Sequence, residues 1–278
     1  MIDEKVDPIG RAAVLDLLSN EIIRSVDYRS SMDSTNSEAM KQLQGNQIPP
    51  DTLPRLFLTD SQSAGRGRRG RHWQSDEGTL TFSLALARET ASDAHPSVSG
   101  GLNRLPLAVG VGISRYLEFQ FAPLKVRLKW PNDVHVAGGK VAGILIETGS
   151  NCPNRLVIGV GMNIGTVPDL SKDPSSQKPT GLSDVLGRNL ERYAVLSGLV
   201  TEILEAVRDG DSEGDETLRD FRARCLLTGR QISFHIAGDE QTGQCIGISD
   251  NGLLRIAGPQ GELLLSSGEV NLLRPSRS

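Results

Sequence analysis

A segment rich in glycine and arginine constrains the fold more than any other part of the chain: Gly65-Arg66-Gly67-Arg68-Arg69-Gly70-Arg71-His72-Trp73. Its glycines match the GxGxxG spacing of dinucleotide-binding loops, but those loops open directly into a helix. The next regular segment here, Thr79 to Ala87, instead alternates with the period of a strand. No GxxxxGK[ST] phosphate loop occurs either. The sequence therefore argues against an ordinary dinucleotide fold and favours a loop between strands.

The charge of this segment indicates an anionic ligand. Four arginines fall within six residues, although the whole chain has a net charge of −4. Two like charges about 4 Å apart repel by about 4 kcal/mol at an effective dielectric of about 20. The forked guanidinium group suits carboxylate and phosphate oxygens. The alternative is a solvated basic loop, but the glycine spacing and the adjacent Trp73 favour a loop that orders over an anion.

A second informative run, Lys129-Trp130-Pro131-Asn132-Asp133, spans the end of a strand predicted at Val126 to Trp130. Its polar residues Asn132 and Asp133 come just after that strand. Two further strands, 134–136 and 141–146, are separated by Gly138-Gly139, which suits a tight hairpin turn. The hairpin returns Lys140 toward Asn132 and Asp133. Taken alone, Pro-Asn-Asp is more often a turn than a site, and a lysine after a hairpin is usually solvated.

The remaining pattern predicts an α+β fold. Helical periodicity covers 14–22, a short stretch after Ser34-Thr35-Asn36, 106–119 and 196–207, and further strands are predicted at 56–58 and 156–164. The polar run 166–181 is predicted to be a loop. From about Leu227 onward, five short strand candidates suggest a small barrel closing on itself: Gln231–Ile236, Gln244–Ile248, Leu253–Ile256, Leu263–Ser266 and Val270–Leu273. We therefore expect one domain over 1–225 and a second over 226–278.

Composition excludes several classes of protein. No apolar run approaches the roughly 20 residues of a membrane helix, and the acidic N-terminus is unlike a secretory signal. The three cysteines lack metal-site or disulfide spacing, which is typical of reduced thiols in a cytoplasmic protein. The negative net charge argues against a general nucleic-acid binder.

Together these motifs resemble the biotin–protein ligase family. The resemblance runs from about Asp27 to the end of the chain and rests on five motifs in order: Ser34-Thr35-Asn36; Gln62 with Gly65 to Gly70 and Trp73; Lys129 to Asp133; Lys140-Val141-Ala142-Gly143-Ile144-Leu145; and Gly159-Val160-Gly161-Met162-Asn163. It implies a mixed-sheet, class-II-synthetase-like catalytic domain followed by a small SH3-like β-barrel. Both expectations agree with the coarse pattern described above.

The resemblance also implies roles for individual residues. Biotin would be bound by Ser34, Thr35, Asn36 and Gln62. Of these, Ser34, Thr35 and Gln62 would contact its ring and ureido group. Arg66, Gly67 and Arg68 would hold the carboxylate and the phosphate, and Lys140 would contact the same acyl-phosphate region. Trp73 would pack against the ordered loop, and Asn163 would reach toward the nucleotide. Asn132 and Asp133 would lie near the phosphates and contact them through Mg²⁺. The resemblance does not specify which residues coordinate the metal.

The activity implied is the ATP-dependent formation of biotinyl-5′-AMP, followed by transfer of biotin to a lysine of a biotin carboxyl carrier protein or carboxylase carrier domain. Arg68 and Lys140 would offset the repulsion between the two anions, and Asp133 is the candidate to take the proton of the acceptor amine. Some family members carry an N-terminal DNA-binding domain. We expect none here, and hence no specific DNA binding. Some relatives also form homodimers through a sheet edge, but no stretch of this sequence identifies that edge.

Two alternatives remain. A lipoate–protein ligase shares the chemistry and the general fold, although the arginine loop and Lys129 to Asp133 favour biotin. A non-catalytic module could instead grip nucleic acid or a phosphorylated partner through the arginine loop. Such a module would bind with strong salt dependence and would form no ATP-dependent product.

Overall fold

The structure, a computed structural model, describes residues 1–88, 101–165, 167, 178–209, 216–236, 238–258 and 261–273. Most of the loop predicted at 166–181 lies outside these residues. Among the described residues, no helix is both long and apolar enough to cross a lipid bilayer.

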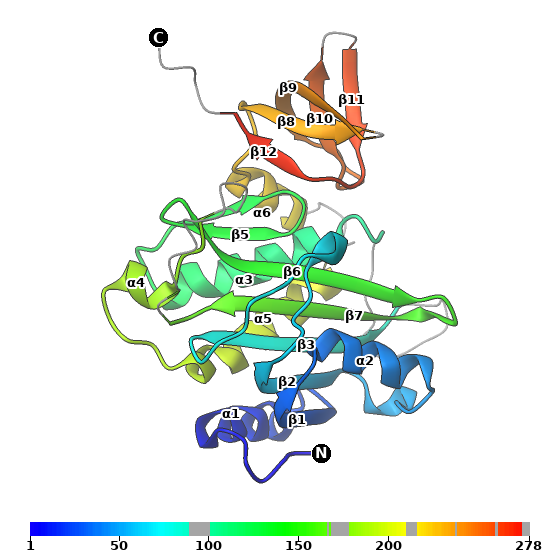
Figure 1. Cartoon of the computed structure of the whole chain (residues 1–278), viewed down its shortest axis with the longest axis vertical. Helices are drawn as coiled ribbons and strands as arrows, with labels where there is room; N and C mark the ends of the chain where they lie inside the picture. Colours follow the sequence, from blue (N-terminus) through cyan, green and yellow to red (C-terminus); the bar gives the residue numbers. More distant parts are fainter. Residues whose placement is uncertain are drawn as a thin grey trace.

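A mixed seven-stranded sheet forms the larger part of the molecule (Figure 1). Its strand order is β1-β2-β3-β7-β6-β5-β4. Only the β1–β2 pair is parallel, and the other neighbours are antiparallel. The strands are β1 (Ser25–Met32), β2 (Arg55–Gln62), β3 (Thr79–Ala87), β4 (Val126–Lys129), β5 (Asp133–Val136), β6 (Gly139–Gly149) and β7 (Cys152–Asn163). The α+β fold and the mixed sheet predicted from the sequence are confirmed.

Helices cover both faces of this sheet because its central strands carry apolar side chains on both sides. Every residue of β3 from Thr79 to Leu86 is buried. On one face, α3 (Leu105–Gln120) packs against α5 (Leu196–Arg208) in the main core, and on the other α2 (Thr35–Gln44) packs with Phe57 and Val157 in a smaller core (Figure 1). The other helices are α1 (Pro8–Ser19), α4 (Leu182–Leu186) and α6 (Glu216–Arg224), with short 3₁₀ turns η1 (Pro50–Thr52), η2 (Arg68–Gly70) and η3 (Arg192–Val195).

Strand β1 was missed by the sequence interpretation. Its charged residues hide the strand pattern: Asp27 is only 1% exposed and pairs with Arg29 at 2.6 Å. Because the ion pair compensates the buried carboxylate, a polar sequence occupies a strand whose residues 26–28 are buried.

The C-terminal part is an antiparallel five-stranded sheet, in the order β11-β10-β9-β8-β12 (Figure 1). Its strands are β8 (Gln231–Ile236), β9 (Asp239–Ile248), β10 (Leu254–Gly258), β11 (Gly261–Leu265) and β12 (Val270–Leu272). All five strand predictions fall on these elements. Within the residues described, no ladder joins β11 to β12. The sheet is therefore open here, and a closed barrel stays a prediction.

The two sheets are joined by specific contacts. The buried indole of Trp130 donates a hydrogen bond from Nε1 to the Gly252 carbonyl at 3.0 Å, and the Leu226 amide donates to the Leu128 carbonyl at 2.7 Å. These contacts hold the C-terminal sheet beside the strand end that leads to Asn132 and Asp133.

Candidate active site

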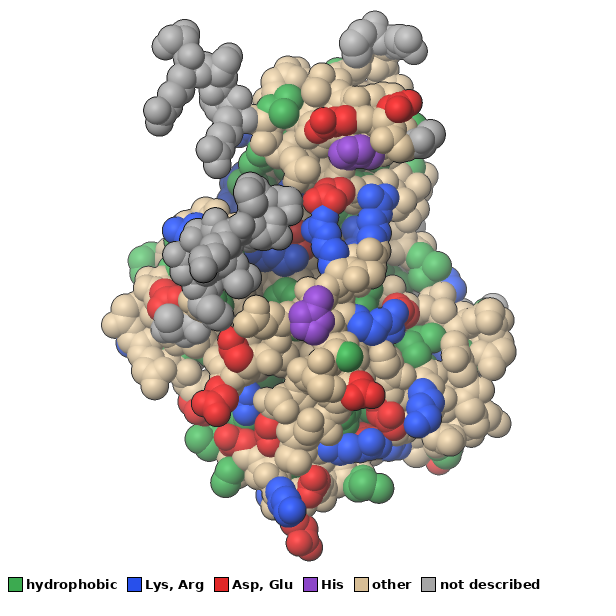
Figure 2. Space-filling model, in the orientation of Figure 1, with side chains coloured by type: hydrophobic (Ala, Val, Ile, Leu, Met, Phe, Trp, Pro, Cys, Tyr) green, Lys and Arg blue, Asp and Glu red, His purple; other side chains and the backbone are tan. Residues whose placement is uncertain are grey.

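A pocket lies where the two sheets meet. It is lined by the N-terminus of α2, the loop between β2 and β3, the turn from β4 to β5, strands β6 and β7, and residues 268–270 of the C-terminal part. Lys and Arg side chains gather on this face, below the C-terminal sheet (Figure 2). Although the net charge of the chain is −4, positive side chains are thus concentrated at this face.

The arginine loop folds onto this pocket as a compact turn. The Gly67 amide donates to the Arg71 carbonyl at 2.8 Å, and the Trp73 amide donates to the Gly65 carbonyl at 2.9 Å. Arg69 and Gly70 adopt positive φ angles of 57° and 73°, a conformation that glycine adopts at little cost. Residues 66–69 and 71–73 line the pocket, and several of them are also exposed to solvent.

Trp73 forms one wall of the pocket. Its ring packs on Gly161, and the ammonium nitrogen of Lys140 lies 5.8 Å from the ring centroid. Such a position suits a cation–π contact. The indole Nε1 is buried and has no hydrogen-bond partner among the described residues.

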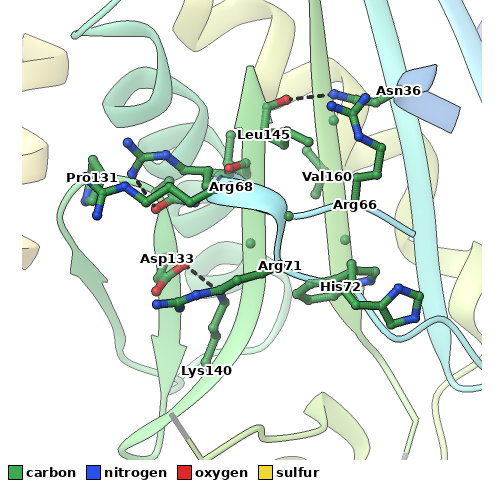
Figure 3. A pocket seen from close by; sticks show the side chains of 18 of the residues that line it. Asn36, Arg66, Arg68, Arg71, His72, Pro131, Asp133, Lys140, Leu145 and Val160 are labelled. Atoms are coloured by element: carbon green, nitrogen blue, oxygen red, sulfur yellow. Dashed lines mark hydrogen bonds and ion pairs between the residues drawn. The ribbon is translucent and has the colours of Figure 1, made fainter. Parts of the chain in front are cut away.

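Cationic side chains converge at one side of the pocket. Arg68 donates to Asn132 Oδ1 at 3.2 Å, and Lys140 Nζ lies 2.6 Å from Asp133 Oδ1 (Figure 3). Burial lowers the pKa of the Arg68 guanidinium, and repulsion from Arg69 adds to that effect, while Asp133 opposes it. Burial likewise lowers the pKa of Lys129, again against the attraction of Asp133. These shifts mark positive charge that a bound anion would stabilise.

Uncharged polar groups line the other side. The backbone amide of Thr35 donates to Gln62 Oε1 at 2.8 Å, and the hydroxyl oxygens of Thr35 and Ser83 lie within hydrogen-bond distance of each other at 2.7 Å. Ser34 caps α2 by accepting a hydrogen bond from the Ser37 amide. Thr81 lines the pocket with a buried hydroxyl that has no partner among the described residues. This side therefore offers hydrogen bonds to a neutral polar ligand group.

Two other arginines of the loop are already paired with carboxylates. Arg66 forms a two-bond ion pair with Glu147, and Arg71 pairs with Glu269 of the C-terminal part. Arg68 differs from both, because its hydrogen-bond acceptor is the neutral side-chain amide of Asn132. The pocket therefore contains arginines in different electrostatic states.

All but one of the residues singled out from the sequence line the pocket: Ser34, Thr35, Asn36, Gln62, Arg66, Gly67, Arg68, Trp73, Asn132, Asp133 and Lys140. Asn163 does not line it, and instead donates to the Lys140 carbonyl at 3.4 Å. Thr81 and Glu269 were missed. Thr81 reads as one more residue of an alternating strand, and nothing in the sequence brings Glu269 near residue 71.

The described residues hold no group of three or more His, Cys, Asp or Glu side chains arranged to bind a metal. Asp133 and Glu269 are the carboxylates in the pocket lining. Mg²⁺ commonly binds through one or two carboxylates together with substrate phosphates and water. The oxygens of Asp133 and Asn132 fit such partial coordination.

The arginine loop of this mixed sheet covers a pocket that is cationic on one side and neutral on the other. Such a pocket is typical of the class of proteins that bind a small organic anion. Comparisons with known proteins narrow the class. The model of the biotin/lipoate A/B protein ligase family matches residues 30–163. The biotin–[acetyl-CoA-carboxylase] ligase of Paracoccus denitrificans is 30% identical over 86% of this chain and 96% of its own length.

Two further comparisons agree. The bifunctional ligase/repressor BirA of Bacillus subtilis is 27% identical over 88% of this chain and 73% of its own length. The structure of the Aquifex aeolicus biotin protein ligase with biotin and ATP superposes with a TM-score of 0.73 at 28% identity, covering 91% of this chain and 100% of that one. The chain belongs to the biotin–protein ligase family.

Proposed function

We propose that the protein is an ATP-dependent biotin–protein ligase, which forms biotinyl-5′-AMP and then transfers biotin to a lysine of a carboxylase carrier domain. The observation that carries this proposal is the division of one pocket into two sides. Arg68 and Lys140 supply positive charge on one side, and Thr35, Gln62 and Thr81 supply uncharged polar atoms on the other. Biotin has the matching polarity, with a carboxylate at one end and a neutral ureido group at the other.

In the first half-reaction, a biotin carboxylate oxygen attacks the α-phosphorus of ATP, and the bond to pyrophosphate breaks. Both reactants are anions, so they repel each other unless fixed positive charge lies between them. We assign that task to Arg68 and Lys140, whose charges are already in place before the reaction begins. Asn132 orients Arg68 through its side-chain oxygen.

In the second half-reaction, the amine of the acceptor lysine attacks the carbonyl carbon of the anhydride, and AMP leaves. The amine must lose a proton, and Asp133 is the proposed acceptor because its carboxylate lies in the pocket beside Lys140. Trp73 is proposed to border the nucleotide, whereas Asn163 acts behind the pocket wall through the Lys140 carbonyl. A bound Mg²⁺ would be held by Asp133 and Asn132, and would neutralise phosphate charge.

Several finer assignments belong to the same proposal. Ser34, Thr35, Asn36 and Gln62 bind biotin, with Ser34 and Asn36 acting from the N-terminus of α2. Residues 1–225 form the class-II-synthetase-like catalytic domain, and 226–278 form the SH3-like domain. The protein acts in the cytoplasm, with a biotin carboxyl carrier protein as its partner and without sequence-specific DNA binding. Dimerisation through a sheet edge stays a prediction.

The test is incubation of the purified protein with labelled ATP and biotin, followed by chromatography for biotinyl-AMP. A parallel reaction with lipoate discriminates between the two acids that the family model covers. The expected result is a biotin adduct in at least tenfold excess over the lipoate adduct. Failure to form any acyl-adenylate, or a preference for lipoate, would reject the proposal.

A further inference from the structure

Arg66 and Glu147 form the most complete ion pair at the arginine loop. Arg66 Nη2 lies 2.7 Å from Glu147 Oε1, and Nη1 lies 3.2 Å from Oε2. Paired contacts of this kind are the strong geometry of arginine and carboxylate. Glu147 lies on β6 and does not line the pocket, whereas Arg66 does. The pair therefore connects the pocket loop to the sheet beneath it.

Glu147 is itself fixed by buried groups. Asn36 Nδ2 donates to Glu147 Oε2 at 3.0 Å and to the Leu145 carbonyl at 3.3 Å. Asn36 is only 3% exposed, and its Oδ1 accepts a hydrogen bond from Ser83 Oγ at 2.6 Å. The amide can thus move little without breaking buried hydrogen bonds. A continuous chain of contacts therefore runs from Ser83 on β3 through Asn36 and Glu147 to Arg66.

The side chains of Arg66 and Arg68, which both line the pocket, point in different directions. In Figure 3, Arg66 extends toward Asn36, whereas Arg68 extends toward Pro131. Arg66 has a carboxylate partner, whereas Arg68 donates to the neutral side-chain amide of Asn132. A guanidinium that already balances a carboxylate has little net charge to offer a second one.

We propose that Glu147 is a positioning residue that anchors the arginine loop through Arg66, and that Arg66 serves as this anchor and does not hold the substrate carboxylate. Recognition of the carboxylate charge then falls to Arg68, whose hydrogen-bond partner Asn132 is neutral. The statement about the carboxylate deepens the proposed function and rests on it, but the anchor itself depends only on contacts within the chain. The two parts therefore need separate experiments.

The first experiment uses the full-length protein without ligand. Trypsin cleaves after arginine only where the chain can leave its folded conformation, so the rate of cleavage at residues 66–71 reports the anchor. Glu147→Ala and Arg66→Ala are expected to raise that rate at least tenfold, because each removes both charge-assisted hydrogen bonds between the loop and β6. In the double variant the increase should be less than the product of the two single effects.

Glu262→Ala is the matched control, because Glu262 forms a similar two-bond pair with Arg255 at 2.7 and 3.0 Å, at an exposed site in the C-terminal sheet. It should leave cleavage at the loop within twofold of wild type. Wild-type cleavage in Glu147→Ala, with its thermal midpoint unchanged, would overturn the anchor. An equal rise in Glu262→Ala would do the same, because the effect would then be general destabilisation.

The second experiment compares the Kd of biotin with that of its neutral alcohol analogue by calorimetry. Arg66→Ala should weaken both by the same factor within twofold, because a loosened loop affects either ligand. Arg68→Ala should weaken biotin at least tenfold more than the alcohol. Arg66→Ala behaving like Arg68→Ala would refute the assignment of Arg66. If the wild-type protein binds neither compound, the proposed function fails, while the trypsin experiment still decides the anchor.

A third measurement separates positioning from catalysis. Glu147→Ala should raise the KM for biotin about tenfold in pyrophosphate exchange, with kcat changed less than threefold, because the loop is displaced before binding and restored in the complex. A fall in kcat at unchanged KM would contradict a positioning role. Restoration toward the wild-type KM in Glu147→Asp would support the carboxylate itself as the anchor, and no restoration would argue against it.

Discussion

The indole ring of Trp73 lies so close to Gly161 that a Cβ atom at residue 161 would stand 2.2 Å from ring atom Cε2. Gly143 is the cross-strand partner of Gly161, and a Cβ there would come within 3.2 Å of the same ring. The two paired glycines on β6 and β7 thus form a flat surface against which the tryptophan ring packs. No other residue type leaves that space open.

Because the Trp73 ring packs against Gly161, we expect Gly161→Ala to displace the ring. The arginine loop, which directly precedes Trp73 in the chain, should be displaced with it. We expect formation of biotinyl-AMP to fall at least tenfold, with the secondary structure unchanged by circular dichroism. Gly101→Ala is the control, because a Cβ there meets nothing within 4 Å. Equal activity in both variants would show that the ring position is not important for the reaction.

Arg68→Ala should reduce adenylate formation at least 100-fold, the typical loss for one preorganised transition-state contact. The reason is that Arg68 is a partly buried cation whose pKa is lowered by burial, so that a developing negative charge beside it stabilises its charged form and is stabilised in turn. Pyrophosphate exchange measures this half-reaction directly. Exchange near the wild-type rate would refute the role of Arg68.

Lys140→Ala should impair adenylation more than transfer from pre-formed biotinyl-AMP. Its ammonium lies 2.6 Å from Asp133, on the side of the pocket where the phosphate charge would develop. Rates of the two half-reactions, measured separately with the same carrier protein, check this difference. An equal loss in both would mean that Lys140 acts on the fold or on both steps.

Trp130→Phe should lower the free energy of unfolding by about 1–3 kcal/mol, because it leaves the Gly252 carbonyl without its donor. Urea unfolding followed by fluorescence of Trp73 or by circular dichroism measures the change. The control is Phe119→Leu, since Phe119 is 85% exposed. A variant as stable as wild type would show that the indole contact does not hold the two sheets together.

Burial raises the pKa of the Cys245 thiol to about 11, from an ordinary value of 9.0. At pH 8 only about one molecule in a thousand would carry the reactive thiolate, so Cys152, which is partly exposed, should be alkylated first. The unfolded thiol ionises before the folded one. The free energy of unfolding should therefore fall as the pH rises from about 9 toward 11. Mass spectrometry after alkylation, and urea titrations across this range, test both expectations.

Local periodicity predicted most of the elements but not how they pair. The alternation of Thr79 to Ala87 and the helical spacing near Leu105 and Leu196 each correspond to an observed element. The predicted hairpin before Lys140 also formed, but its turn residues are Ala137 and Gly138, with φ angles of 48° and 81°. The predicted turn, Gly138-Gly139, was one residue too late, because Gly139 already pairs as the first residue of β6. The parallel β1–β2 pair could not be predicted, because a buried ion pair disguises β1 and no local signal specifies a parallel neighbour.

The sequence predicted most of the residues that line the pocket, but not which of its charged side chains pair with one another. The sequence motifs predicted that Arg66, Arg68 and Lys140 lie in one site, because each residue follows or belongs to a recognisable strand. They did not indicate that Glu147, on a strand of mainly apolar residues, would neutralise Arg66. Nor did they bring Glu269 from the C-terminal sheet to Arg71. Such long-range pairings depend on tertiary packing, which local sequence does not encode.

Strand β6 carries Lys140, Gly143 and Glu147, which respectively supply an ammonium group to the pocket, room for the tryptophan, and an attachment point for the loop. A slip of one residue along a strand turns every side chain to the opposite face. An insertion between Lys140 and Glu147 would therefore turn the residues on one side of it to the opposite face and break at least one of the three contacts. Chain length can change more safely at Ala137 and Gly138, upstream of all three, so homologous ligases can be expected to vary in the turn and keep the strand at constant length.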